Sequence, residues 1–246
     1  MRDLYSCRIC QSTCLEGLVC CPFPEPLIGS WKASFAIVGI NPGSSSGNFE
    51  DLNQYIAYYS NSKECGLILD PEKRWQIGYV KAYTLLFSRP GNTELAIDDF
   101  NENAVILSVI KCSTADASKI RGQRLEMAKA NCIDYLARQL EIIKPKVILT
   151  HGKPSCLAMI DVLKNETKFT IVSTSSDKSI NTLAEEMRRP YSMDEISKEY
   201  IEAKSENGHR TLFLFNTHLS YYGPAAKSLD KNLEEKRKKI DDVLHD

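Results

Sequence analysis

The sequence predicts an α/β protein whose mainly parallel sheet is covered by helices on both faces. Two observations predict it: apolar runs the length of buried strands, such as Phe35–Val38 and Ala104–Ile110, and segments of helical periodicity between them. Strands that alternate with helices pair in parallel and are buried on both faces. A chain of 246 residues can bury a full core without disulfides.

The elements alternate along the whole chain. The predicted strands are Phe35–Val38, Ala104–Ile110, Lys146–Leu149, Phe169–Val172 and Arg210–Phe215. The predicted helices cover residues 76–87, 124–143, a segment opened by Pro154, and 225–244. Residues 173–208 are polar and charged, so we expect an inserted segment, with a helix near 193–203, inside one domain that spans residues 1–246.

Composition excludes several classes of function. The 31 basic and 32 acidic side chains nearly cancel, which excludes a strongly basic nucleic-acid coat, so a nucleic acid would be held by a local patch. No apolar run approaches the roughly 18 residues of a membrane span, and the first residues do not form a signal segment. We therefore expect a cytoplasmic monomer that does not bind membranes. Walker and Gly-x-Gly-x-x-Gly loops are missing from the sequence, so nucleotide hydrolysis and dinucleotide binding have no support.

Cysteines crowd the start of the chain. Five of the nine fall within the first 21 residues: Cys7, Cys10, Cys14, Cys20 and Cys21. An odd number of cysteines without a secretory signal argues against a disulfide framework. Cys7 and Cys10 supply two thiolates close enough to share one metal. The set could be completed by Cys14 with Cys20 or Cys21, or by the distant Cys112 and Cys132, and the spacing does not choose between them.

Polar residues follow the ends of the predicted strands, where ligands bind in parallel sheets. Asn41, in the loop Gly39-Ile-Asn-Pro-Gly43, carries an amide able to hold a water molecule or read the edge of a heterocycle. A neutral His218 could donate a hydrogen bond to an oxygen that develops negative charge, and His151 competes for this role. The structural alternatives are a tight turn for Asn41 and a loop histidine for His218.

Six motifs occur in an order that is found in a known family. They are Cys7-Arg-Ile-Cys10, Val38-Gly-Ile-Asn-Pro-Gly43, Ile110-Lys-Cys112, Cys132-Ile-Asp-Tyr-Leu136, the stretch Arg138–Ile148, and Thr217-His-Leu-Ser220. With these motifs the chain resembles the uracil-DNA glycosylase superfamily, particularly its iron–sulfur, family 4-like branch. The first loop has the Gly-Ile-Asn-Pro-Gly form of the mismatch-specific and thymine-DNA glycosylase branch. The motifs span nearly the whole chain.

The resemblance implies a three-layer α/β/α sandwich around a four-stranded, mainly parallel sheet. It also implies a [4Fe–4S] cluster, with zinc as the alternative metal, on Cys7, Cys10, Cys112 and Cys132. The implied activity is DNA repair: hydrolysis, without lyase chemistry, of the N-glycosidic bond of uracil or another deaminated or damaged base flipped out of DNA. The protein would then act at the nucleoid.

The resemblance also assigns roles in the site. It implies that Asn41 holds the water that attacks the sugar and that His218 contacts the carbonyl oxygen of the departing base. Phe49 is the expected stacking aromatic, with Tyr55 as a second candidate. Further substrate contacts are expected from Gly39, Ile40, Pro42, Gly43, Ser108, Ser220 and Tyr221, with the loop 220–224 pressing on the minor groove.

Two positions depart from the family pattern. Ser108 stands where many members have a base-reading Asn, and Leu219 replaces the usual Pro. Because a Ser hydroxyl lacks the paired donor and acceptor of an amide, the favoured base need not be uracil. Two other functions stay open: a non-catalytic nucleic-acid-binding protein on the same fold, and a zinc-binding α/β protein that acts on a small molecule. Basic residues between the two later cysteines are expected to face DNA phosphates: Lys119, Arg121, Arg124 and Lys129.

Overall fold

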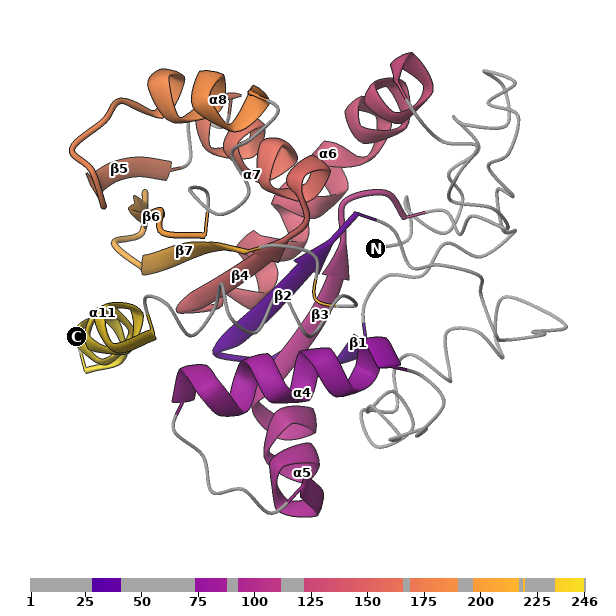
Figure 1. Ribbon diagram of the computed structural model, residues 1–246, viewed down its shortest axis with the longest axis vertical. Coiled ribbons are helices and arrows are strands. Elements are labelled where there is room, and N and C mark those ends of the chain that lie inside the picture. The colour runs from indigo at the N-terminus through magenta and orange to yellow at the C-terminus, as the bar shows by residue number, and fades with distance from the viewer. Residues whose placement is uncertain are drawn as a thin grey trace, which may run out of the picture.

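The chain folds as an α/β protein with helices on both faces of a mixed sheet (Figure 1). The computed structural model describes residues 28–40, 74–87, 93–111, 122–165, 169–189, 197–216, 219 and 233–245. Within these ranges one seven-stranded sheet has the order β1-β3-β2-β4-β7-β6-β5.

Parallel strands form the middle of the sheet. They are β3 (Ala104–Ser108), β2 (Phe35–Gly39), β4 (Val147–His151) and β7 (Arg210–Asn216). Antiparallel strands extend the sheet on both sides: β1 (Ile28–Gly29) beside β3, then β6 (Tyr200–Ser205) and β5 (Phe169–Thr174) beyond β7. The expected α/β class is therefore confirmed, but the expected number of four strands is wrong. The strands beyond these four are β1 at one edge of the sheet and β6 and β5 at the other.

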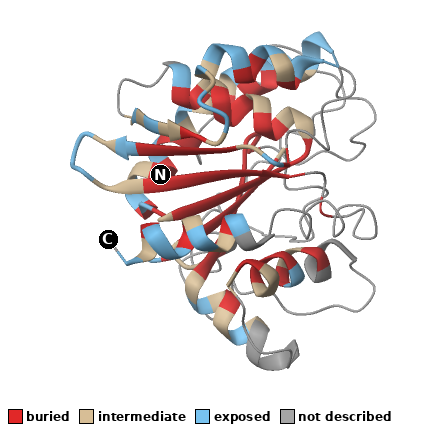
Figure 2. Ribbon diagram, turned by 60° about the vertical axis from the view of Figure 1, so that its left-hand side comes forward, coloured by how far each residue is buried: buried red, intermediate tan, exposed pale blue. Residues whose placement is uncertain are grey.

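Helices lie on both faces of the sheet because successive residues of the central strands are apolar and point to opposite sides. Phe35 and Ile37 pack toward α4 (Arg74–Phe87), α5 (Thr93–Asn103) and α11 (Leu233–Leu244). Ala36 and Val38 pack toward α6 (Gln123–Ile143), α7 (Lys153–Asn165) and α8 (Ile180–Arg188). Figure 2 shows the buried strands between the two helical layers. None of the described helices combines the length and apolarity needed to cross a membrane.

The polar segment 173–208 contributes to the sheet. It contains the end of β5, helix α8 and all of β6, and residues 200–204 of β6 pair with β7. The predicted helix near 193–203 is wrong at its end, because residues 200–203 belong to β6. The composition of this segment is polar partly because β6 carries charged side chains such as Glu202. This carboxylate is only 4% exposed and lies 2.6 Å from the guanidinium of Arg210.

A buried lysine on α11 gives a prediction for stability. Lys236 is 1% exposed, and its Nζ has no hydrogen-bond partner among the described residues. Burial lowers the pKa of Lys236 from 10.5 to about 8, and only the charge of Glu235 opposes this. Between these two pKa values the unfolded chain binds more protons than the folded chain. The free energy of unfolding therefore rises with pH from about 8 upward.

We expect Lys236→Met to raise the free energy of unfolding at pH 7 by roughly 2–4 kcal/mol. The gain should shrink as the pH rises from about 8 to 10.5, because the lysine is then neutral in the folded chain and loses its proton in the unfolded chain. Urea unfolding at the two pH values measures it, with the exposed neighbour Lys238→Met as the matched control. A Lys236→Met protein less stable than the wild type at pH 7 would contradict this account.

Candidate functional site

Four residues form a row across the carboxyl edge of the parallel strands: Ser108, Gly39, His151 and Asn216. We call them the strand-end row. Gly39 is paired with Ser108, and His151 is paired with Asn216. The β2–β4 register pairs Val38 with Thr150, which places Gly39 beside His151. Each member of this strand-end row lies two residues beyond an apolar residue that packs toward α4, so all four face that helix.

Tyr79 of α4 closes over the middle of the row. Its hydroxyl lies 3.0 Å from Nε2 of His151, and the two rings are 5.2 Å apart. A Cβ on Gly39 would lie 3.0 Å from the same Nε2, so any larger residue at this position would press on the imidazole. His151, which the sequence predicts as an alternative to His218, is thus a buried residue whose imidazole hydrogen-bonds with the hydroxyl of Tyr79.

Asn216 ends the row on β7 and is completely buried. Its backbone carbonyl accepts a hydrogen bond from Gly152 N–H at 2.9 Å. Neither the nitrogen nor the oxygen of its side-chain amide has a hydrogen-bond partner among the described groups. A buried amide with both atoms unpaired is costly, so this position needs an explanation.

Lys111 fixes the end of β3 next to the row. The side chain is 1% exposed, and its Nζ donates to the backbone oxygen of Ser108 and to Oε1 of Gln139 on α6. Ser108 itself is 8% exposed. The charge-assisted bond therefore satisfies the Ser108 carbonyl, and the hydroxyl is the group that the Ser108 side chain contributes to the row.

Helix α4 also contacts the chain that follows His218. A Cβ on Gly78 would lie 2.6 Å from the backbone oxygen of Leu219, and the Leu219 side chain is 1% exposed in the core beneath α4. This close approach fixes the position of Leu219 relative to α4 and to the strand-end row.

The structure describes only some of the predicted site residues. Gly39 and Ser108 lie in the strand-end row, while the half-buried Ile40 packs against the small cluster around Cys132. The other predicted residues lie outside the described ranges: Asn41, Pro42, Gly43, Phe49, His218, Ser220, Tyr221, Cys7, Cys10 and Cys112.

Cys132 lies on α6 beside the exit of β3. It is 3% exposed and packs with Ile110, two residues before Cys112, and with Ala128. On the other side of β3, Ile28 of β1 pairs antiparallel with Ile106. β1 therefore begins at the carboxyl edge, the edge at which β3 ends. Within the described ranges no three His, Cys, Asp or Glu side chains gather as a metal site.

Cys156 and the predicted basic residues complete the description of the site. Cys156 is a buried thiol, and burial raises its pKa to about 12, so it stays protonated. Lys129 is buried and pairs with Glu126 at 2.9 Å, so it does not offer a charge to DNA phosphates. Arg124 is exposed, and Lys119 and Arg121 lie outside the described residues.

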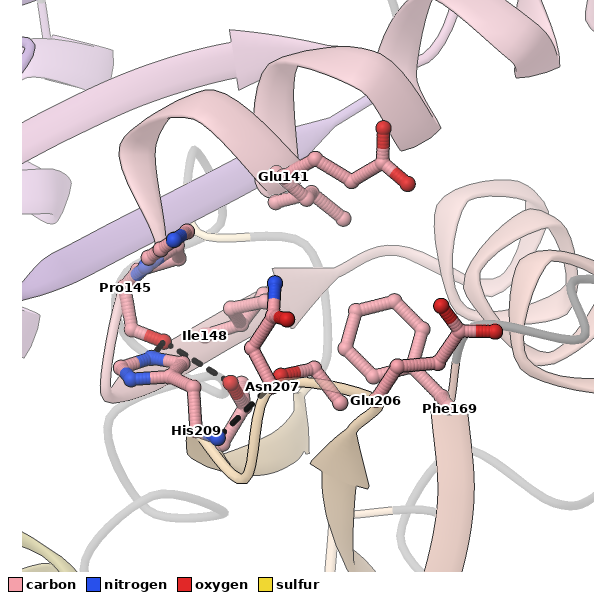
Figure 3. Close-up of a pocket in the computed structure, with 11 residues that line it drawn as sticks. Glu141, Pro145, Ile148, Phe169, Glu206, Asn207 and His209 are labelled. Carbon is pink, nitrogen blue, oxygen red and sulfur yellow. Dashed lines mark hydrogen bonds between the residues drawn. The ribbon is translucent and has the colours of Figure 1, made fainter.

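A separate cavity of about 350 Å³ opens at the opposite, amino-terminal edge of the sheet (Figure 3). Ile148 and Phe169 provide apolar walls, and Glu141 and Glu206 carry carboxylates beside it. His209 Nε2 lies 3.3 Å from the oxygen of Pro145 at one side. The volume suits a small ligand, but none of the predicted site residues that the structure describes lines the cavity.

Sequence reasoning missed the partners within the strand-end row. His151 was considered only as a competitor of His218, and Tyr79 and Asn216 were not considered at all. The available signal was positional: Asn216 ends a predicted strand and precedes His218 by two residues.

The fold and site thus define an α/β protein with a buried polar row at the carboxyl edge of its sheet. No protein-family model matches the chain, and no curated protein is similar enough to count as a relative.

Proposed function

We propose that the protein is a monofunctional DNA glycosylase that hydrolyses the N-glycosidic bond of uracil or another deaminated or damaged base. The arrangement of the strands carries the proposal. β2 and β7 flank β4 in parallel, so their carboxyl ends lie about 10 Å apart at one edge. Asn41 follows β2 by two residues and His218 follows β7 by two residues. This spacing suits a base held between an amide and an imidazole.

The proposed chemistry needs no nucleophile from the protein. The Asn41 amide, which both donates and accepts, orients the water that attacks the anomeric carbon of the sugar. The base departs with negative charge on a carbonyl oxygen, and the His218 N–H stabilises that charge. Extrusion of the nucleotide costs least for a mispaired base, which contributes to selectivity.

We further propose that Cys7, Cys10, Cys112 and Cys132 hold a [4Fe–4S] cluster. The position of Cys132 supports this proposal, because it packs beside the end of β3 and β1 begins at the same edge of the sheet. When bound, the cluster would supply a covalent tie between segments distant in the sequence. Analysis of iron and acid-labile sulfide tests this directly.

One observation favours a second candidate, a zinc-binding protein that acts on a small molecule. The cavity at the amino-terminal edge has the volume of a small-ligand site. Stoichiometric zinc without iron, together with a small molecule that raises the melting temperature, would favour this function.

A panel of duplexes that carry uracil, hypoxanthine or xanthine tests the proposed activity. We expect purified protein to release the base from at least one of them and leave an alkali-labile abasic site, while an undamaged duplex of the same sequence stays intact. Salt-dependent binding of damaged duplexes without any abasic product would instead support a non-catalytic DNA-binding protein.

A further inference from the structure

The side chain of Asn216 has hydrogen-bonding capacity that the described structure does not use. It is 0% exposed, and both atoms of its amide lack a hydrogen-bond partner among the described groups. An amide kept for packing alone would be replaced by an apolar residue of similar size at no cost or with a gain in stability. A buried donor and acceptor side by side instead match a ligand that presents the complementary pair.

The position of Asn216 indicates what that ligand is. Its side chain lies on the α4 side of the sheet, next to His151 in the strand-end row. It precedes His218 by two residues at the end of β7. Ser108, at the other end of the row, offers a single hydroxyl, which cannot supply a donor and an acceptor in one plane.

We propose that Asn216 is the specificity-determining residue that reads the edge of the extruded base, an inference that rests on the proposed glycosylase function. The amide nitrogen donates to a ring carbonyl, and the amide oxygen accepts from the adjacent ring N–H. Uracil, hypoxanthine and xanthine all present this pair, whereas a methyl group on the ring nitrogen destroys it. Because Asn216 is closed to solvent, binding requires the strand-end edge to open as the base enters.

Binding of free bases tests Asn216 without requiring catalysis. The probes are uracil and hypoxanthine, with 3-methyluracil and 1-methylhypoxanthine as their blocked analogues, titrated calorimetrically into the full chain. We expect Asn216→Leu to weaken binding of the unblocked base by about 10- to 100-fold. We also expect its melting temperature to rise by about 2–4 °C, because the unpaired amide is gone.

Two further variants complete the design. Asn216→Ser keeps a polar atom but shortens its reach, so we expect it to lose base binding without the rise in melting temperature. Thr150→Val is the matched control, because Thr150 is also buried with an unpaired side-chain oxygen but lies on the opposite face of the same sheet edge. It should leave base binding unchanged.

The outcomes separate this inference from the proposed function. An Asn216→Leu protein that binds uracil or hypoxanthine as tightly as the wild type, or that melts at a lower temperature, would assign Asn216 a structural role. A wild-type protein that binds neither base, or that binds the blocked analogues equally well, would overturn the proposed role of Asn216 in base recognition. A wild type that binds a base through Asn216 but yields no abasic product from DNA would overturn only the glycosylase proposal.

Discussion

Replacing His218 by alanine is expected to lower the rate of base release by roughly 10²–10³, with little change in binding of damaged DNA. In the proposed mechanism the His218 imidazole stabilises negative charge that develops as the glycosidic bond breaks. Its removal should therefore lower the single-turnover rate. Affinity for the duplex should persist because DNA backbone contacts dominate it. Single-turnover assays on the duplex that the wild type processes best, with affinities measured in parallel, separate the two effects.

Two other histidines serve as controls for this variant. His245 is exposed beyond the end of α11, so His245→Ala should match the wild type. His151 is buried in the strand-end row and bonded to Tyr79, so its replacement should disturb stability as well as rate. If His218→Ala kept the full rate while His151→Ala lost it at unchanged stability, the assignment of His218 would be wrong.

Gly78→Ala is expected to lower both the free energy of unfolding and the proposed activity. In a helix, alanine is ordinarily favoured over glycine by about 1 kcal/mol. In α4, however, the added Cβ would lie 2.6 Å from the backbone oxygen of Leu219, so the helix or the chain at Leu219 must move. Such overpacking typically costs about 1–3 kcal/mol, which outweighs the helical gain. Because Leu219 follows His218 directly, the rate should fall as well.

Gly122→Ala is the comparison for this variant. No atom lies within 4 Å of a Cβ built there, but the backbone φ is 55°, so a loss of stability at Gly122 reflects backbone strain alone. Urea unfolding and the glycosylase assay should show a loss of stability in both variants and a loss of rate only in Gly78→Ala. A Gly78→Ala protein more stable than the wild type would contradict the contact between α4 and Leu219.

The parallel core of the fold could be predicted from the sequence because its strands are apolar on both faces. The runs Phe35–Val38 and Lys146–Leu149 fall within or next to β2 and β4, and the long amphipathic segment 124–143 matches α6. Helix α5 was missed, since its mean composition is polar and only one side contacts the core. β6 was missed because it carries buried charge, with Glu202 neutralised by Arg210.

The candidate site could be predicted only in outline. Asn41 and His218 follow β2 and β7 in the sequence, and these parallel strands end at the same edge of the sheet. The partners within the strand-end row depend on register, which decides that His151 stands beside Asn216 and opposite Tyr79. Register comes from packing between segments far apart in the sequence, so no local pattern reveals it.

The extra strands change how firmly β7 is held. In a four-stranded sheet of this order β7 would be the outermost strand, with one side free to fray. Here β4 pairs with one side of β7 and β6 with the other, so peeling β7 away means breaking two ladders of backbone hydrogen bonds at once. The segment with the polar composition thus stabilises β7, the strand that precedes His218 in the sequence.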